Sequence, residues 1–374
     1  MLARSTAEPE QASRRSELAF NILGTDVEVT ADDPGDLTVS SAFMEAYAER
    51  ARSPGRRRME VRVTRSSWIE PNGTDAIAVH RTKHPYWSFD GAILEQTPRR
   101  VAWPSRRITC QVSAARLDIV AANDLPTAFA SESIFHAIRS VALPLRDSGA
   151  MLHASGIVTE GRAMLFCGDV LAGKTTLMSE AVLRHGAVPL ANDRVLLTQG
   201  AAGGVTAHSW PSYASYCEGT LLRYPELESA ALEYERPECS YRTQCWPEAL
   251  ARTYDKNRKR IYPMRWFSDT AGCRYATEAP LGALVFPKLA LDDRPLSLRR
   301  LANAECLTRL QSLVFRHPDP AFRPWHGIAP REPMQDPADL FTGAAVPAFE
   351  IVVPAATLSD FRELMDTIVS RWQV

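Results

Sequence analysis

Residues 163–175 read Ala-Met-Leu-Phe-Cys-Gly-Asp-Val-Leu-Ala-Gly-Lys-Thr, which is an apolar run followed by a glycine-rich turn. The turn fits the pattern Gly-x-x-x-x-Gly-Lys-[Ser/Thr] at all of its fixed positions, Gly168, Gly173, Lys174 and Thr175. The apolar run predicts a strand, and residues 176–185 have helical character up to Gly186, a typical residue after a helix end. A strand, a loop and a helix in this order predict an α/β fold.

Each fixed residue of this loop has a chemical reason to be there. Glycines permit turns that aim successive backbone N–H groups at an anion, and a helix beginning at Lys174 points its positive end at the same place. Lys174 supplies a cation for the β- and γ-phosphates of a nucleotide, and the Thr175 hydroxyl suits a Mg²⁺ ion bound to them. We therefore expect a phosphate-binding loop of the Walker A type, with these nucleotide-binding residues: Gly168, Gly173, Lys174, Thr175 and Thr176.

A carboxylate is expected at the end of the next strand. Residues 187–191 are a short strand candidate, and Asn192, Asp193 and Arg194 follow it. Asp193 is placed to hold Mg²⁺, directly or through water, together with Thr175. An Asn-Asp pair is also common in ordinary turns, so a purely structural turn is the alternative.

Three segments together resemble the catalytic domain of HPr kinase/phosphorylase: His153-Ala154-Ser155-Gly156, the loop, and residues 190–195. More broadly, they are similar to the HPr kinase-like group, which includes peptide-tailoring kinases and whose nucleotide core is similar to that of phosphoenolpyruvate carboxykinase. A weaker likeness continues through residues 209–211, 259–260 and 280–286, whereas the first 120 residues match no family on this reading.

The resemblance implies an ATP-dependent kinase whose ATP–Mg²⁺ residues are Gly168, Gly173, Lys174, Thr175 and Asp193. It also places His153 in the active site, although a histidine beside a strand is often a hydrogen-bonded core residue. Asp169 matches an acidic position of the family, where it either orients an incoming hydroxyl group or caps the loop.

One position departs from the family pattern. The family has an Asp-Asp pair after the strand, and its first aspartate, the expected general base, is Asn192 here. An amide cannot accept a proton as a carboxylate does. Three readings follow: the base is His153 or Asp169; base catalysis is nearly dispensable, because phosphoryl transfer is largely positioning and electrostatics; or the protein binds ATP without transferring phosphate. The departure also disfavours the reverse, phosphorylase reaction.

The composition excludes several classes of protein. The chain has 374 residues, 45% hydrophobic and 23% charged, which is enough for two structural units. A net charge of −1 favours neither nucleic acid nor an anionic membrane as a partner, and no apolar run approaches the length of a membrane span. Residues 1–18 lack the apolar core of a secretory signal, and the seven cysteines include no Cys-x-x-Cys pair, which indicates a reduced, cytoplasmic protein.

The chain divides into three parts by pattern. Residues 1–16 are predicted to be a disordered tail. Short alternating runs separated by turns predict an antiparallel, β-rich N-terminal domain over residues 17–123. Residues 124–374 are expected to form the kinase domain, which opens with a helix and closes with helices at 301–316 and 361–372.

Residues 206–278 contain many aromatic residues among arginines and prolines but no long periodic element. They predict an irregular segment that faces the substrate or forms a lid, with core packing of most of the aromatics as the alternative. A basic cluster within it is suited to clamp phosphates or an acidic acceptor, or else is a solvated loop: Lys256, Arg258, Lys259 and Arg260.

These expectations describe an ATP-dependent kinase that phosphorylates a hydroxyl group. The acceptor stays open between a serine of a peptide or protein and a small molecule such as a nucleoside, sugar or antibiotic. A non-catalytic nucleotide-binding or regulatory module is the alternative that Asn192 favours. An ATPase or GTPase switch is weaker, because no Asn-Lys-x-Asp guanine-reading motif is present. HPr kinases are hexamers, and this sequence leaves its own assembly open, a homo-oligomer included.

Overall fold

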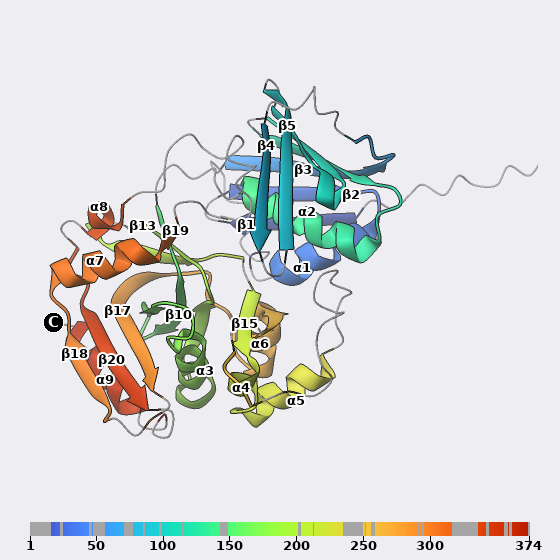
Figure 1. The fold of residues 1–374 in the computed structure, drawn as a ribbon. Coiled ribbons are helices and arrows are strands. Elements are labelled where there is room, and N and C mark those ends of the chain that lie inside the picture. The colour runs from blue at the N-terminus through green and yellow to red at the C-terminus, as the bar shows by residue number, and fades with distance from the viewer. Residues whose placement is uncertain are drawn as a thin grey trace, which may run out of the picture.

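The computed structural model shows a mixed α/β protein with two large sheets (Figure 1). It describes residues 16–22, 25–44, 47, 57–70, 78–84, 87–96, 99–113, 115–142, 149–200, 203–211, 213–234, 250, 252–255, 259–290, 292, 295–315, 336–341, 344–354, 358 and 361–372. Of the predicted tail, residues 1–15 lie outside this set, and residue 16 begins the first strand.

The first sheet is built from the N-terminal part of the chain. Its strands are β1 (Ser16–Ile22), β2 (Thr25–Ala31), β3 (Arg57–Ser66), β4 (Ala78–His84), β5 (Trp87–Gln96), β6 (Arg99–Trp103), β7 (Ile108–Val112) and β8 (Arg116–Ala122), in the spatial order β1-β2-β3-β8-β7-β6-β5-β4. The prediction of an antiparallel sheet is wrong for two pairs, since β2–β3 and β3–β8 are parallel. Parallel neighbours need a crossover rather than a tight turn, and helices between β2 and β3 supply part of one.

Helices cover one face of this sheet. They are η1 (Pro34–Leu37), α1 (Thr38–Met44) and α2 (Thr127–Ala142). The apolar side chains Ile134, Phe135 and Ile138 of α2 join the core of the sheet, and the Phe43 and Phe135 rings stack with centroids 4.8 Å apart. The helix that the sequence assigned to the start of the second unit therefore packs against the first.

The second sheet carries the glycine-rich loop. Its strands are β9 (Ala150–Leu152), β10 (Ala154–Thr159), β11 (Arg162–Cys167), β12 (Val188–Ala191), β13 (Val195–Gln199), β14 (Val205–Ser209), β17 (Glu278–Ala290), β18 (Ser297–Arg300), β19 (Val314–Phe315) and β20 (Ala348–Pro354). The main path runs β12-β10-β11-β17-β14-β13-β9-β19, and β17 also pairs with β20, which pairs with β18. The long strand β17 is parallel to both β11 and β20, so it lies at the centre of the unit.

Helices pack on both faces of this sheet. Met164 and Phe166 of β11 join the cluster that contains α3 (Lys174–His185) and α9 (Phe361–Trp372), whereas Leu165 and Cys167 join the cluster that contains α7 (Asn303–Leu313) and α8 (Pro337–Phe341). This alternation follows from the two-residue period of a strand. The predicted C-terminal helix at 361–372 is confirmed, with Phe361, Leu364, Met365 and Ile368 buried. The helix predicted at 301–316 is observed as α7, followed by β19.

A third group of elements lies in the segment predicted to be irregular. It comprises β15 (Tyr213–Cys217), α4 (Glu218–Leu221), α5 (Pro225–Glu233), β16 (Lys259–Pro263) and α6 (Met264–Thr270), with β15 and β16 paired antiparallel. Its aromatics form a core: the Tyr262 and Trp266 rings stack at 3.8 Å, and Tyr216 is fully buried beside them. The described part of this segment is therefore regular, because tertiary packing stabilises elements too short to be stable alone.

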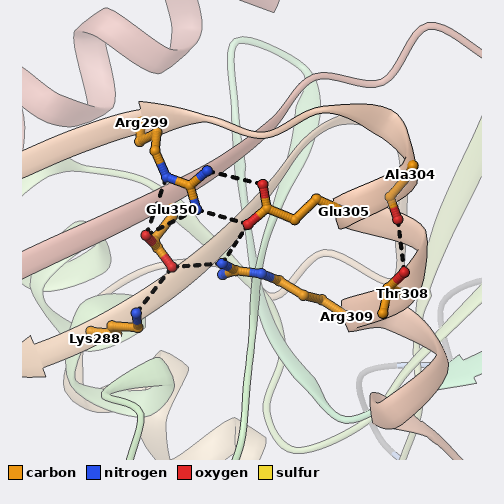
Figure 2. Close-up of polar contacts among 7 residues, drawn as sticks. All are labelled: Lys288, Arg299, Ala304, Glu305, Thr308, Arg309 and Glu350. Atoms are coloured by element: carbon orange, nitrogen blue, oxygen red, sulfur yellow. Dashed lines mark hydrogen bonds and ion pairs between the residues drawn. The ribbon is translucent and has the colours of Figure 1, made fainter.

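A charged cluster joins the central strand to the edge of the sheet (Figure 2). Glu350 of β20 contacts Lys288 of β17 at 3.1 Å, Arg299 of β18 at 3.2 Å and Arg309 of α7 at 2.8 Å. Glu305 bridges the two arginines at 2.8 Å each. These contacts bind the sheet edge to α7, next to Leu289 of the site described below.

The two sheets also share a buried contact. The Tyr47 hydroxyl lies 2.7 Å from Oγ of Ser209, and Trp210 packs in the core of the first sheet. Within the described part of the chain, no helix combines the length and the apolar character needed to cross a membrane.

Candidate functional site

Residues 168–173 connect β11 to α3, so a strand, a loop and a helix occur in the predicted order. The loop is close to β17, because the Leu289 N–H donates to the Ala172 carbonyl at 3.1 Å. Gly173 has φ +97°, and a Cβ atom there would lie 2.6 Å from Cβ of Leu289. Only glycine meets both conditions without strain.

The N-terminus of α3 opens into a pocket. The helix begins at Lys174, and no side chain caps its first turn. Gly173, Lys174, Thr175 and Thr176 all line the pocket. Uncapped N–H groups and the positive end of a twelve-residue helix together favour an anion at this position.

Lys174 is folded back over the loop. Its Nζ donates to the carbonyl oxygens of Gly168 at 2.7 Å and Asp169 at 2.8 Å. Burial lowers the pKa of Lys174 to about 8, a shift that the Asp193 carboxylate opposes and the Lys259 charge increases. An incoming phosphate oxygen would offer this ammonium group a stronger, charged partner than a carbonyl does.

Asn192 is buried at the end of β12 with its side-chain oxygen engaged. That oxygen accepts hydrogen bonds from the Ser155 hydroxyl at 2.7 Å and the Thr175 hydroxyl at 3.1 Å. Asn192 therefore links the strand β10 to the first turn of α3. In the sequence Ser155 is only part of the motif at residues 153–156, because its bond to Asn192 forms only in the folded chain.

His153 and Asp193 form a pair at the edge of the pocket. Nε2 of His153 lies 3.2 Å from Oδ1 of Asp193, and Nε of Arg194 lies 3.7 Å from Oδ2. Partial burial raises the pKa of Asp193, but the other effects outweigh it. The hydrogen bond from His153 and the charges of His153, Arg194 and Lys174 bring the pKa to well below its usual range. The Asp193 backbone is left-handed, with φ +74°, which an aspartate tolerates better than most residues. Asp193 is therefore a carboxylate at neutral pH.

One pocket brings together most of the residues that the sequence singled out. It is lined by His153, Gly173, Lys174, Thr175, Thr176, Asn192 and Asp193. Gly168 and Asp169 do not line it; the Gly168 carbonyl holds Lys174, and Asp169 is exposed. The same pocket is also lined by residues that no motif indicated, Ser215, Cys217, Thr220 and Tyr254, and by Lys259 of the predicted basic cluster.

The basic cluster is not a single surface. Lys259 lines the pocket, whereas Arg260 is buried and lies 3.3 Å from the Glu218 carboxylate. Lys256 and Arg258 lie outside the described residues. The alternating directions of successive strand residues separate two basic neighbours, which a count of charges in the sequence does not reveal.

The pocket has donors that fit a nucleotide-bound Mg²⁺ ion. The Thr175 hydroxyl and the Asp193 carboxylate both line it, and hard oxygen ligands of this kind are those that Mg²⁺ prefers. Among the described residues, no group of three or more His, Cys, Asp or Glu side chains could hold a metal ion.

Comparisons with known proteins give matches among solved structures alone. No family model matches the chain, and no curated protein matches it. A solved structure to which it is similar is the Hpr(Ser) kinase/phosphatase from Coxiella burnetii, with 14% sequence identity and a TM-score of 0.25 over 60% of this chain and 95% of that one. Likeness at this level decides neither fold nor function, so the proposal below depends on the chain's own residues.

Proposed function

We propose that the protein is an ATP-dependent phosphotransferase, a kinase that transfers the γ-phosphate of ATP to a hydroxyl group. The observation that carries the proposal is the convergence of Lys174, Thr175, Asp193 and His153 on one pocket at the N-terminus of α3. The acceptor is a serine of a peptide or protein, or a small molecule such as a nucleoside, sugar or antibiotic.

The loop side of the pocket is suited to bind the nucleotide. Lys174 and the N–H groups of the first turn of α3 would bind the β- and γ-phosphates. Thr175 and Asp193 would hold Mg²⁺. When bound, that ion neutralises charge on the phosphates and orients them.

Transfer requires one bond to form and one to break. The acceptor oxygen bonds to the γ-phosphorus while the bond from that phosphorus to the β–γ bridging oxygen breaks, and ADP leaves.

The proton of the acceptor hydroxyl group needs a base to receive it. Asn192 is an amide, Asp169 lies outside the pocket, and the lowered pKa of Asp193 makes it a weak base. We assign the proton to the His153 imidazole, which lies 3.2 Å from the Asp193 carboxylate.

The second candidate is a nucleotide-binding regulatory protein without transfer activity. Asn192 favours it, because the position expected to carry a general base holds a buried amide that bonds to Ser155 and Thr175. In this case ATP binding would stabilise the protein, but no acceptor would be consumed.

The test is to incubate the full chain with Mg-ATP and a panel of peptides, nucleosides, sugars and antibiotics. ADP and phosphorylated product are measured together. We expect equal amounts of both with an active acceptor, no transfer by Lys174→Ala, and unchanged transfer by Arg265→Ala, a charge removal on α6 outside the pocket. Tight ATP binding without product across the panel would support the regulatory protein instead, and ADP release without any acceptor would support an ATPase.

A further inference from the structure

The strands β15 and β16 bring a second cation to the pocket. β15 and β16 are paired so that Cys217 lies opposite Lys259. Directly opposed residues of an antiparallel pair share one face, and Ser215, two residues before Cys217, shares it too. All three line the pocket. The strand geometry therefore directs Lys259 toward the loop.

The other face of the same two strands anchors the wall. Tyr216 and Tyr262 pack into the aromatic core, and Arg260 forms an ion pair with Glu218 in which both side chains are 2% exposed. The Gly219 N–H donates to the Thr253 carbonyl at 2.8 Å, which attaches the segment carrying Tyr254. A cation on a wall packed in this way is positioned before any ligand arrives.

Lys259 has no protein counter-ion in the described part of the chain, where no hydrogen bond or ion pair involves its Nζ. Its charge acts on Lys174 and contributes to the lowered pKa of that residue. The Asp193 carboxylate is already in contact with His153 and Arg194. Two lysines facing one cavity repel each other, and an anion between them removes the repulsion.

We propose that Lys259 binds the terminal phosphate of ATP from the β15–β16 side of the pocket. This inference rests on the proposed function. In this arrangement Lys174 and the α3 N-terminus hold the phosphate chain, and Lys259 meets its free end. Lys259 thus contacts a group that ATP has and ADP lacks, and it stabilises negative charge on the group during transfer.

The inference is tested by nucleotide binding to the full chain. Calorimetry in the presence of Mg²⁺ measures the dissociation constants of ATP and ADP for the wild type, Lys259→Ala, Lys259→Arg and Arg265→Ala. We expect Lys259→Ala to weaken ATP binding about tenfold and leave ADP binding nearly unchanged, because one charge-assisted contact is lost from ATP alone. Lys259→Arg should recover most of the ATP affinity, and Arg265→Ala should bind both nucleotides as the wild type does.

Each other outcome has a definite meaning. Unchanged ATP binding by Lys259→Ala, or equal weakening of ATP and ADP, overturns the inference and leaves the proposed function standing. Unchanged binding of both nucleotides with a raised KM for an acidic acceptor would assign Lys259 to the acceptor instead. A wild-type protein that binds neither nucleotide overturns the proposed function itself. Circular dichroism of each variant verifies that the chain is folded.

Discussion

Nε2 of His153 lies 3.2 Å from Oδ1 of Asp193, although the two residues belong to different strand ends of the second sheet. His153 lies between β9 and β10, where its backbone N–H donates to the Leu313 carbonyl at 2.9 Å. Asp193 follows β12, which pairs with β10. The pairing of these strands therefore brings an imidazole and an ionised carboxylate to the mouth of the loop, where one can accept a proton and the other can hold a metal ion.

Substitutions of His153 test whether its imidazole accepts the proton or only positions Asp193. The amide side chain introduced by His153→Gln can still donate a hydrogen bond to Asp193 but cannot take up the proton of the acceptor hydroxyl at neutral pH. We expect the transfer rate to fall about a hundredfold or more, as for loss of a general base, with ATP affinity changed little. Initial rates and calorimetry measure the two quantities. Wild-type rates in His153→Gln, with loss only in His153→Ala, would mean that the imidazole positions Asp193 and moves no proton.

The pKa of Lys174 predicts how nucleotide binding depends on pH. Burial lowers this pKa to about 8 in the free protein, and a bound phosphate favours the charged form, so it raises the pKa in the complex. Affinity for ATP should therefore be flat below about pH 7.5 and fall as the pH rises through 8, because binding then requires proton uptake. Lys174→Arg, which stays charged, should show no such fall. A flat wild-type profile to about pH 9.5 would contradict the expectation.

The sequence predicts the loop side of the site because its chemistry is local. Glycines and a lysine at fixed spacing specify a backbone turn and a helix start, and Asp193 follows from the order of the next strand. The C-terminal helix α9 is equally local, since its period of 3.6 residues is independent of the rest of the fold.

The remaining features depend on pairing between distant residues. Cys217 and Lys259 become neighbours only because β15 pairs with β16, and the parallel neighbours of β3 arise in the same way. No short pattern encodes either arrangement. A residue that fits a sequence pattern can also lie outside the site. Asp169 matches an acidic position of the family pattern, yet its exposed side chain does not line the pocket.

Two glycines at the ends of α3 separate backbone strain from steric crowding. Both have positive φ, +97° at Gly173 and +70° at Gly186, but only an added Cβ at Gly173 meets an atom, Leu289 Cβ at 2.6 Å. Gly186→Ala should lower the free energy of unfolding by about 1 kcal/mol, from strain alone. Gly173→Ala should lower it by about 2–3 kcal/mol and also weaken ATP binding. Chemical denaturation compares them, and equal losses would show that Leu289 moves aside freely.

The charged cluster around Glu350 should make the free energy of unfolding depend on pH. Burial raises the pKa of Glu350, but the contacts with Arg309, Lys288 and Arg299 outweigh this effect and lower the pKa to about 2. A carboxylate with a lowered folded-state pKa stabilises the protein above its unfolded-state value of about 4.5, and this contribution is lost as the pH falls toward 2. Glu350→Gln should therefore lower the free energy of unfolding by about 1–2 kcal/mol at pH 7, after allowance for solvent screening, and by nothing near pH 2.

The control for this prediction is Asp269→Asn, which removes an exposed ion pair with Arg265 and should cost little stability at any pH. Denaturation curves across this pH range decide the matter, and a Glu350→Gln loss that persists at pH 2 would attribute the effect to packing rather than charge.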